Sequence, residues 1–120
     1  MVKKLDMRKG STTILVLSLL SEKPMYGYQI AKELSTRSGG IFDFKEGTLY
    51  PALHRMEKDG LLLSYWEVVQ EGPSRKYYTI TDKGNDTLAR RSKDWSDLAH
   101  ALLRVLEGVK NQCLSQITVS

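Results

Sequence analysis

The sequence predicts a mostly α-helical fold with a small β-hairpin. Apolar residues recur at helical spacing in three successive segments, at residues 12–21, 25–38 and 46–59. After Gly60 the apolar period falls to two, and a helical period returns after Thr81. The predicted order of elements is therefore three helices, a hairpin and one long final helix.

The first two predicted helices have residues that suit their ends. Ser11 or Thr12 can cap the first helix, which is apolar on nearly all sides and is therefore expected to be buried. Pro24 ends this helix, because the residue before a proline avoids helical geometry. Gly39 and Gly40 form the C-terminal stop of the second helix.

The third predicted helix has an apolar face and a polar face. Leu49, Leu53 and Met56 lie at positions i, i+4 and i+7 and so share one face. Pro51 costs little in the first turn of a helix, where N–H groups lack partners, so we expect the helix to begin at about residues 46–48. The polar face carries Thr48, Tyr50, His54, Arg55 and Lys58. Such a helix can pack on a core through one face and enter the major groove of DNA with the other.

Two short segments after the third helix are rich in aromatic and β-branched residues, as β-strands are. They span residues 61–69 and 75–80, and Gly72 and Pro73 between them favour a turn. Three helices followed by a hairpin is the order of a winged helix-turn-helix, whose hairpin contacts the DNA backbone beside the recognition helix. The loop ends in a hydroxyl and two cations, on Ser74, Arg75 and Lys76. These groups suit phosphate oxygens, but an ordinary solvated hairpin can also carry them.

The final predicted helix is too long for a small three-helix core to cover, since it would extend about 40 Å. We expect a DNA-binding domain at residues 1–80, a dimerisation helix at 81–112 capped by Thr81, and a flexible tail at 113–120. An exposed apolar stripe on this helix predicts a partner helix, most simply from a second copy of the chain. The stripe contains Leu88, Trp95, Leu98, Leu102, Val105 and Leu106.

The positive charge of the chain is concentrated before the predicted recognition helix. The chain has 120 residues, about one domain, and a net charge of +4. Residues 1–40 hold seven Lys and Arg against three Asp and Glu, a balance of +4. Lys9 and the cations near it are therefore candidates for phosphate contacts, or else a disordered basic end.

Residues with the chemistry of catalysis or metal binding are sparse. His54 and His100 have no Cys, His or carboxylate at metal-ligand spacing, and the sequence suggests no nucleophilic triad or phosphate-binding glycine loop. We therefore expect no enzyme and no cofactor. The single cysteine, Cys113, rules out a disulfide framework, and the longest apolar run, residues 14–20, is too short to span a bilayer. A cytoplasmic protein is the simplest expectation.

Several motifs occur along the chain in a fixed order. They are Met25-Tyr26-Gly27-Tyr28-Gln29-Ile30, Gly47-Thr48-Leu49-Tyr50-Pro51-Ala52-Leu53 with Met56-Glu57, Gly60-Leu61, Gly72-Pro73-Ser74-Arg75-Lys76-Tyr77-Tyr78 and Ile80-Thr81-Asp82-Lys83-Gly84. In order and spacing they resemble the PadR family of bacterial transcriptional regulators, of the smaller type with a single C-terminal helix. The resemblance covers roughly residues 8–107. One departure is Lys45-Glu46, where family members often have a small N-capping residue.

The resemblance implies a homodimeric repressor that binds an inverted-repeat operator and is released by a small effector. It places Tyr50 on DNA, with packing against the second helix as the alternative. One of Tyr26 and Tyr28 is expected to pack inward and the other to reach the DNA backbone, whereas Trp66 is expected to be structural. The expected DNA-binding set is Lys9, Tyr26, Thr48, Tyr50, His54, Arg55, Lys58, Ser74, Arg75 and Lys76.

The resemblance also assigns a role to the C-terminal helix. Trp95, Leu98 and Leu102 are expected to form the dimer core or an effector site. Some relatives bind flat aromatic compounds at the dimer centre, so Trp95 either stacks on such a ligand or only packs between the subunits. The competing hypothesis is a winged-helix protein-interaction module that does not bind DNA. A third is a small-molecule sensor whose DNA role is secondary.

Overall fold

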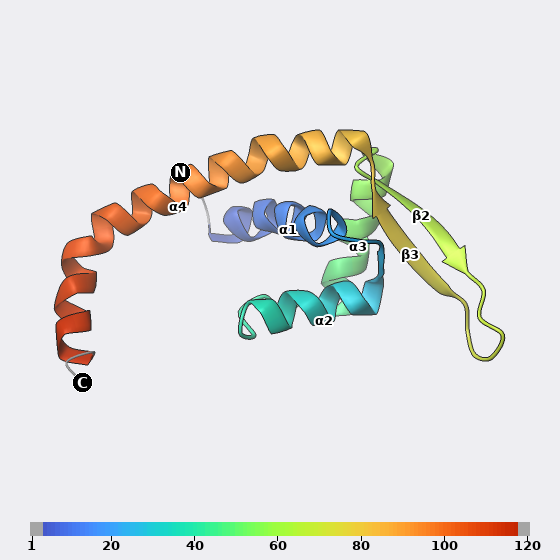
Figure 1. The fold of residues 1–120 in the computed structure, drawn as a ribbon, viewed down its shortest axis with the longest axis horizontal. Helices are drawn as coiled ribbons and strands as arrows, with labels where there is room; N and C mark the ends of the chain where they lie inside the picture. Colours follow the sequence, from blue (N-terminus) through green and yellow to red (C-terminus); the bar gives the residue numbers. More distant parts are fainter. Residues whose placement is uncertain (1–3, 118–120) are drawn as a thin grey trace. The chain divides into compact units, whose positions relative to one another are not determined.

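Four helices and a small antiparallel sheet make up the part of the chain that the structure describes (Figure 1). This computed structural model describes the backbone of residues 4–117 and the side chains of residues 10–107. The elements are α1 (Lys4–Leu20), β1 (Met25–Tyr26), α2 (Gly27–Arg37), α3 (Glu46–Lys58), β2 (Leu62–Glu67), β3 (Arg75–Ile80) and α4 (Asp82–Ile117). The predicted winged helix-turn-helix with a long C-terminal helix is confirmed, with one additional strand.

The sheet has the strand order β1-β3-β2, and both pairings are antiparallel. Met25 lies opposite Tyr78, which in turn lies opposite Ser64 on β2. Because side chains alternate along a strand, these residues share one face of the sheet, and Met25 and Tyr78 are buried there. The opposite face carries an aromatic row across the three strands, of Tyr26, Tyr77 and Tyr65.

The first two helices begin at different residues from those predicted. We expected residues 25–38 to form one helix, but Met25 and Tyr26 are a strand and α2 begins at Gly27. A two-residue strand has no readable period, and its pairing with β3 buries Met25 completely. The prediction of Ser11 or Thr12 as an N-cap was also wrong, because α1 continues through both residues.

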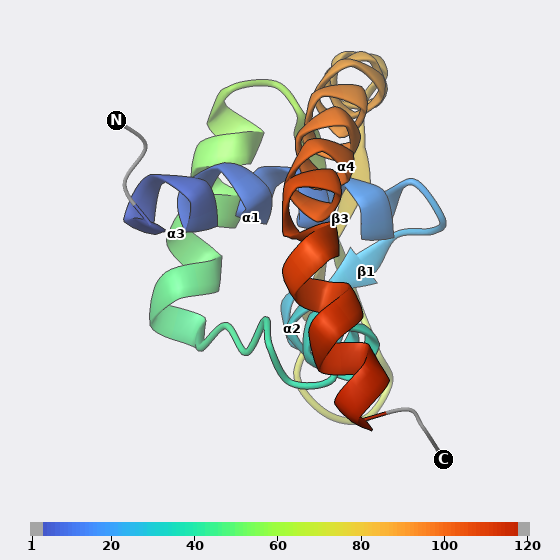
Figure 2. The same cartoon turned by 90° about the vertical axis from the view of Figure 1, so that its left-hand side faces the viewer.

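The core lies between α1, α2, α3 and the inner face of the sheet. α1 packs on both other helices and on β3 (Figure 1 and Figure 2). The core side chains with the lowest exposure are Val16, Leu17, Met25, Ile30, Leu49, Leu53 and Leu62. Their burial, at about 1.5–3 kcal/mol for each large side chain, fixes α3 against the rest of the fold.

The predicted start of α3 is confirmed, although Pro51 does not lie in the first turn. The helix begins at Glu46, so Pro51 is in the second turn. Because proline has no N–H, the carbonyl of Gly47 lacks its usual i+4 donor. Pro51 itself is exposed, so its ring disturbs no core packing.

The start of α4 is fixed by Thr81, as predicted. Its hydroxyl Oγ1 accepts a hydrogen bond of 3.0 Å from the Gly84 N–H and donates one of 2.6 Å to the Gly60 carbonyl. Gly84 is needed for packing, because a Cβ atom there would collide with the Leu61 carbonyl oxygen and lie 2.7 Å from Cγ1 of Ile80. The helix therefore starts in close contact with the residues that lead into β2.

α4 continues for 36 residues to Ile117, past the end expected at residue 112. The chain divides into two compact units between Ala89 and Arg90, inside this helix. In the first unit, Thr87 is buried and Leu88 packs against the core. Within the described residues, no helix combines the length and the apolar character that crossing a membrane requires.

Candidate nucleic-acid interface

α3 buries one face and presents the other to solvent, as the sequence predicted. Leu49, Leu53 and Met56 are 1%, 0% and 3% exposed. The exposed residues on the other face are Thr48, Tyr50, His54, Arg55 and Lys58. The helix is thus held by its apolar side, and its polar side chains are available to a partner.

Tyr50 both packs against α2 and remains accessible. A Cβ atom at Gly27 would lie 2.5 Å from Cε1 of Tyr50 and 2.8 Å from its hydroxyl oxygen. The tyrosine ring therefore occupies the space that any other residue at position 27 would need. Tyr50 is nevertheless 40% exposed, so packing on α2 and contact with a ligand are compatible.

The hairpin of β2, β3 and the loop between them is the wing, and its two cations have different surroundings. The hairpin loop, residues 68–74, extends away from the helices (Figure 1) and includes Gly72 at a φ of 99°. Arg75 is exposed, and its guanidinium carbon lies 4.7 Å from the centre of the Tyr26 ring, a cation–π arrangement. Lys76 is less accessible, and its Nζ atom lies 5.6 Å from the centre of the Tyr78 ring. Arg75 is therefore better placed than Lys76 to meet a phosphate.

Glu57 links α3 to both strands of the hairpin. Its carboxylate accepts a hydrogen bond from the Ser64 hydroxyl on β2, and Lys76 on β3 lies 3.9 Å from it. Burial raises the pKa of the Tyr78 hydroxyl, and the Glu57 carboxylate and Tyr50 raise this pKa further. Tyr78 thus stays neutral at physiological pH. Neither Glu57 nor Ser64 was in the expected set.

Tyr26 and Tyr28 have different surroundings at the start of α2. Tyr26 is half-buried in the aromatic row, with its ring centre 5.4 Å from that of Tyr77. Tyr28 stacks on Tyr26 at 6.5 Å and is 64% exposed. We expected Tyr26 to be the residue that reaches DNA, but Tyr28 is the more accessible of the two.

A groove of about 330 Å³ lies where the start of α2, α3 and the wing meet. It brings together five residues expected to bind DNA and four that were not, Gly27, Tyr28, Trp66 and Tyr78. Trp66 is 64% exposed, which does not fit the structural role expected for it. The groove is lined by Tyr26, Gly27, Tyr28, Tyr50, Trp66, Ser74, Arg75, Lys76 and Tyr78.

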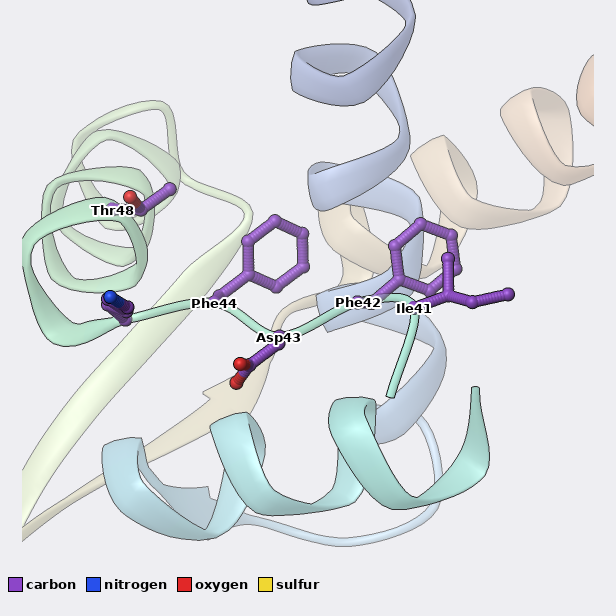
Figure 3. A pocket seen from close by; sticks show the side chains of 6 residues that line it. Ile41, Phe42, Asp43, Phe44 and Thr48 are labelled. Atoms are coloured by element: carbon purple, nitrogen blue, oxygen red, sulfur yellow. The ribbon is translucent and has the colours of Figure 1, made fainter. Parts of the chain in front are cut away.

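A second hollow, of about 260 Å³, lies beside the N-terminus of α3 (Figure 3). Phe42 and Phe44 point to the same side of the loop there, and their rings stack with centres 6.2 Å apart. Both rings pack against the core, so they anchor the loop that leads into α3. Thr48, expected to bind DNA, lines this hollow and not the groove.

The remaining expected residues lie apart from the groove lining. His54, Arg55 and Lys58 are exposed further along α3. Lys9 lies in α1, but its side chain is outside the described residues.

The apolar stripe of α4 is solvent-accessible over most of its length. Leu98 and Leu102 are 44% and 47% exposed, and Trp95 is half-buried. Leu103, Val105 and Leu106, at 51%, 82% and 50%, widen the accessible apolar surface. Leucine and valine so exposed on one helix indicate a surface that a partner covers.

Comparisons with known proteins agree on one family. Residues 16–90 match the Transcriptional regulator PadR-like family. The transcriptional regulator Rv3488 of Mycobacterium tuberculosis is 33% identical over 98 residues, covering 82% of this chain and 88% of that protein. A PadR family transcription regulator of Clostridium difficile has a solved structure that is 40% identical, with a TM-score of 0.69, covering 79% of this chain and 97% of that one. The structure of a transcriptional regulator from Clostridium thermocellum is 31% identical, with a TM-score of 0.74, covering 82% and 96%.

Proposed function

Because the chain belongs to the PadR-like family of transcriptional regulators, we propose that it is a homodimeric repressor that a small effector releases from DNA. Proteins of this family bind DNA and are not enzymes. The observation that carries the proposal is the division of α3 into a buried apolar face and an exposed polar face. The protein would act in the cytoplasm, where it meets its operator.

α3 would supply the contacts that read the operator sequence. Thr48 and Tyr50 lie near its N-terminus, and Arg55 lies about two turns after Thr48 on the exposed surface. An arginine can donate two hydrogen bonds to guanine in the major groove, and hydroxyl groups can bond to several bases. His54 and Lys58 would contact neighbouring bases or phosphates.

The wing and the N-terminal cations would supply contacts to phosphate. Residues 41–80 hold five Lys and Arg against six Asp and Glu, a balance of −1, so α3 itself exerts little electrostatic attraction. Ser74 and Arg75 are exposed on the wing, and Lys9 belongs to the most basic third of the chain. Such contacts give affinity and register without sequence specificity.

We propose that α4 joins two copies of the chain and sets the spacing of their recognition helices. The exposed Leu98 and Leu102 would be covered by the partner helix, and an inverted-repeat operator follows from the two-fold symmetry. Residues 1–80 would then bind DNA, and the helix that follows them would dimerise. An aromatic effector stacking on Trp95 would favour one spacing of the heads and so change DNA affinity.

Selection of bound duplexes from a random DNA pool tests this proposal. We expect an inverted repeat, and binding to it that weakens steeply as salt concentration rises, because phosphate contacts release counterions. Replacing Tyr50 and Arg55 together by alanine should abolish sequence preference. The matched control is the pair Tyr65→Ala and Arg91→Ala, which lies outside α3 and the groove.

The outcomes separate the two leading hypotheses. Recovery of no sequence, or binding that is indifferent to salt, would favour the protein-interaction module over the repressor. Specific binding that survives the loss of both Tyr50 and Arg55 would remove α3 from its proposed role.

A further inference from the structure

We propose that the groove beside Tyr50 holds the sugar–phosphate backbone of one DNA strand, with Trp66 and Tyr28 as its walls. Trp66 would pack against a deoxyribose, and Arg75 would pair with the adjacent phosphate. The inference rests on the proposed DNA-binding function and adds Trp66 and Tyr28 to the residues that perform it.

The exposure of the two aromatic walls is the first argument. Trp66 and Tyr28 are each 64% exposed, although they come from different elements and line one groove. Leaving large aromatic side chains in water forgoes about 1.5–3 kcal/mol for each ring that a partner could bury. Their common position against one hollow indicates a shared ligand with an apolar surface.

The charge of the groove is the second argument. None of the described residues that line the groove is an Asp or a Glu, whereas two of them, Arg75 and Lys76, are cations. Lys76 is partly neutralised by Glu57 at 3.9 Å, so Arg75 is the main site for an anion. α2 also begins here with no acidic residue in its first turn and no side-chain cap, which leaves its partial positive charge uncompensated.

The position of the groove selects the ligand. Its lining comes from the start of α2, from α3 and from the wing, and the last two are the elements proposed to contact bases and flanking phosphates. A DNA strand that passes from α3 to the wing would cross Tyr28, Tyr50 and Trp66. A phosphodiester backbone alternates an anion with an apolar sugar, which matches a cation beside aromatic rings. A flat aromatic acid has similar chemistry and is the competing occupant.

The two walls would act differently from the neighbouring Tyr26. Its ring is already covered by Tyr77 and Arg75, so it has less surface to offer. Tyr28 offers both a ring and a hydroxyl group that can donate to a phosphate oxygen. We therefore expect Tyr28→Phe to remove one polar contact and Trp66→Ala to remove an apolar one.

Trp66 fluorescence provides a direct test. The chain has two tryptophans, so the variant Trp95→Phe leaves Trp66 as the only one. Titration with a duplex selected from the random pool should change Trp66 emission at the concentration where binding occurs. Sedimentation of Trp95→Phe alongside the parent chain checks that assembly is unchanged.

Affinity measurements complete the test. We expect Trp66→Ala to weaken binding to that duplex about tenfold with no change in salt dependence, because the lost contact is uncharged. Arg75→Ala should make the fall of log K with log salt concentration less steep, by about 1 in the slope. Tyr65→Ala, on the opposite face of the same strand, should bind like the parent chain. Trp66→Phe keeps an aromatic ring and should retain most of the affinity.

Each outcome bears on a separate claim. If the parent chain binds no duplex, the proposed function fails and this inference fails with it. If the parent binds but Trp66→Ala matches Tyr65→Ala and Trp66 emission does not respond, the inference is wrong while the DNA-binding function stands. A response of Trp66 to naphthoic acid, without a response to the duplex, would assign the groove to a small aromatic acid instead.

Discussion

Gly27 and Tyr50 fit against each other so closely that a Cβ atom at position 27 would lie 2.5 Å from the tyrosine ring. The contact joins the start of α2 to the exposed face of α3. It sets the direction in which Tyr50 leaves α3, because the ring lies in the space that the missing side chain opens. The glycine is therefore a positioning residue for a side chain proposed to meet DNA.

We predict that Gly27→Ala lowers DNA affinity about tenfold while destabilising the fold by only about 1 kcal/mol. The ring of Tyr50 is 40% exposed, so it can swing outward and relieve the collision without disturbing the core. Urea unfolding and DNA titration measure the two effects separately.

Tyr50→Ala provides the control for this prediction. With the ring removed, the three atoms nearest to the added methyl group are gone, so Gly27→Ala should cost little further affinity in that background. An equal loss in both backgrounds would show that Gly27 does not act through Tyr50.

Gly84→Ala should destabilise the fold by about 2–4 kcal/mol. The new Cβ atom would meet the Leu61 backbone carbonyl and Cγ1 of Ile80, and backbone cannot move aside as a surface side chain can. The first turn of α4 would have to shift away from the sheet. Thermal unfolding measures the loss.

A matched glycine in α3 gives the contrast. Gly47 has no atom within 4 Å of its added Cβ, so Gly47→Ala should stabilise the helix by up to about 1 kcal/mol. Similar behaviour of the two alanine variants would refute the packing role of Gly84.

Glu57→Gln is expected to strengthen DNA binding at low salt. The carboxylate lies 3.9 Å from Lys76, and its removal releases this cation beside the groove. The stability cost should stay below about 1 kcal/mol, because the pair is partly exposed and glutamine can still accept the Ser64 hydrogen bond. Affinity measured over a range of salt concentrations tests this, and an unchanged salt slope would contradict it.

The links between distant residues are the part of the site that the sequence did not reveal. The amphipathic α3 and the hairpin were predictable because each repeats a period over several turns or strand residues. No sequence period signals the ion pair between Glu57 and Lys76, since this pair forms only when the wing packs against α3. The same holds for Tyr26 and Tyr28, because the pairing of β1 with β3 decides which of them enters the aromatic row. The structural role expected for Trp66 is wrong for a related reason. The alternation of side chains along a strand shows which residues share a face, but not which face the rest of the protein covers.

Tyr78 should make the fold less stable at high pH. Burial and the Glu57 carboxylate raise its pKa above the ordinary value, so folding favours the neutral phenol. This contribution is complete below the unfolded pKa of about 10 and is lost as pH rises through the folded value. Stability from urea unfolding between pH 8 and 11 should therefore fall less steeply for Tyr78→Phe than for the parent chain. Tyr65→Phe, which removes the hydroxyl group of an exposed tyrosine, is the matched control.

Leu98 and Leu102 offer the sharpest test of dimerisation through α4. Replacing both by serine should shift the protein from dimer to monomer, because each side chain would lose apolar burial of about 1.5–3 kcal/mol in the interface. The serines leave residues 1–80 unaltered, so the far-ultraviolet circular dichroism should change little. Affinity for a full inverted repeat should drop far more than affinity for a half-site, since the monomer cannot engage both halves.

Lys93→Ser is the control, because its ion pair with Asp97 is exposed at 76% and 63% and contributes little. Analytical ultracentrifugation at micromolar concentration distinguishes the variants, and a parent chain that sediments as a monomer would refute the α4 dimer directly.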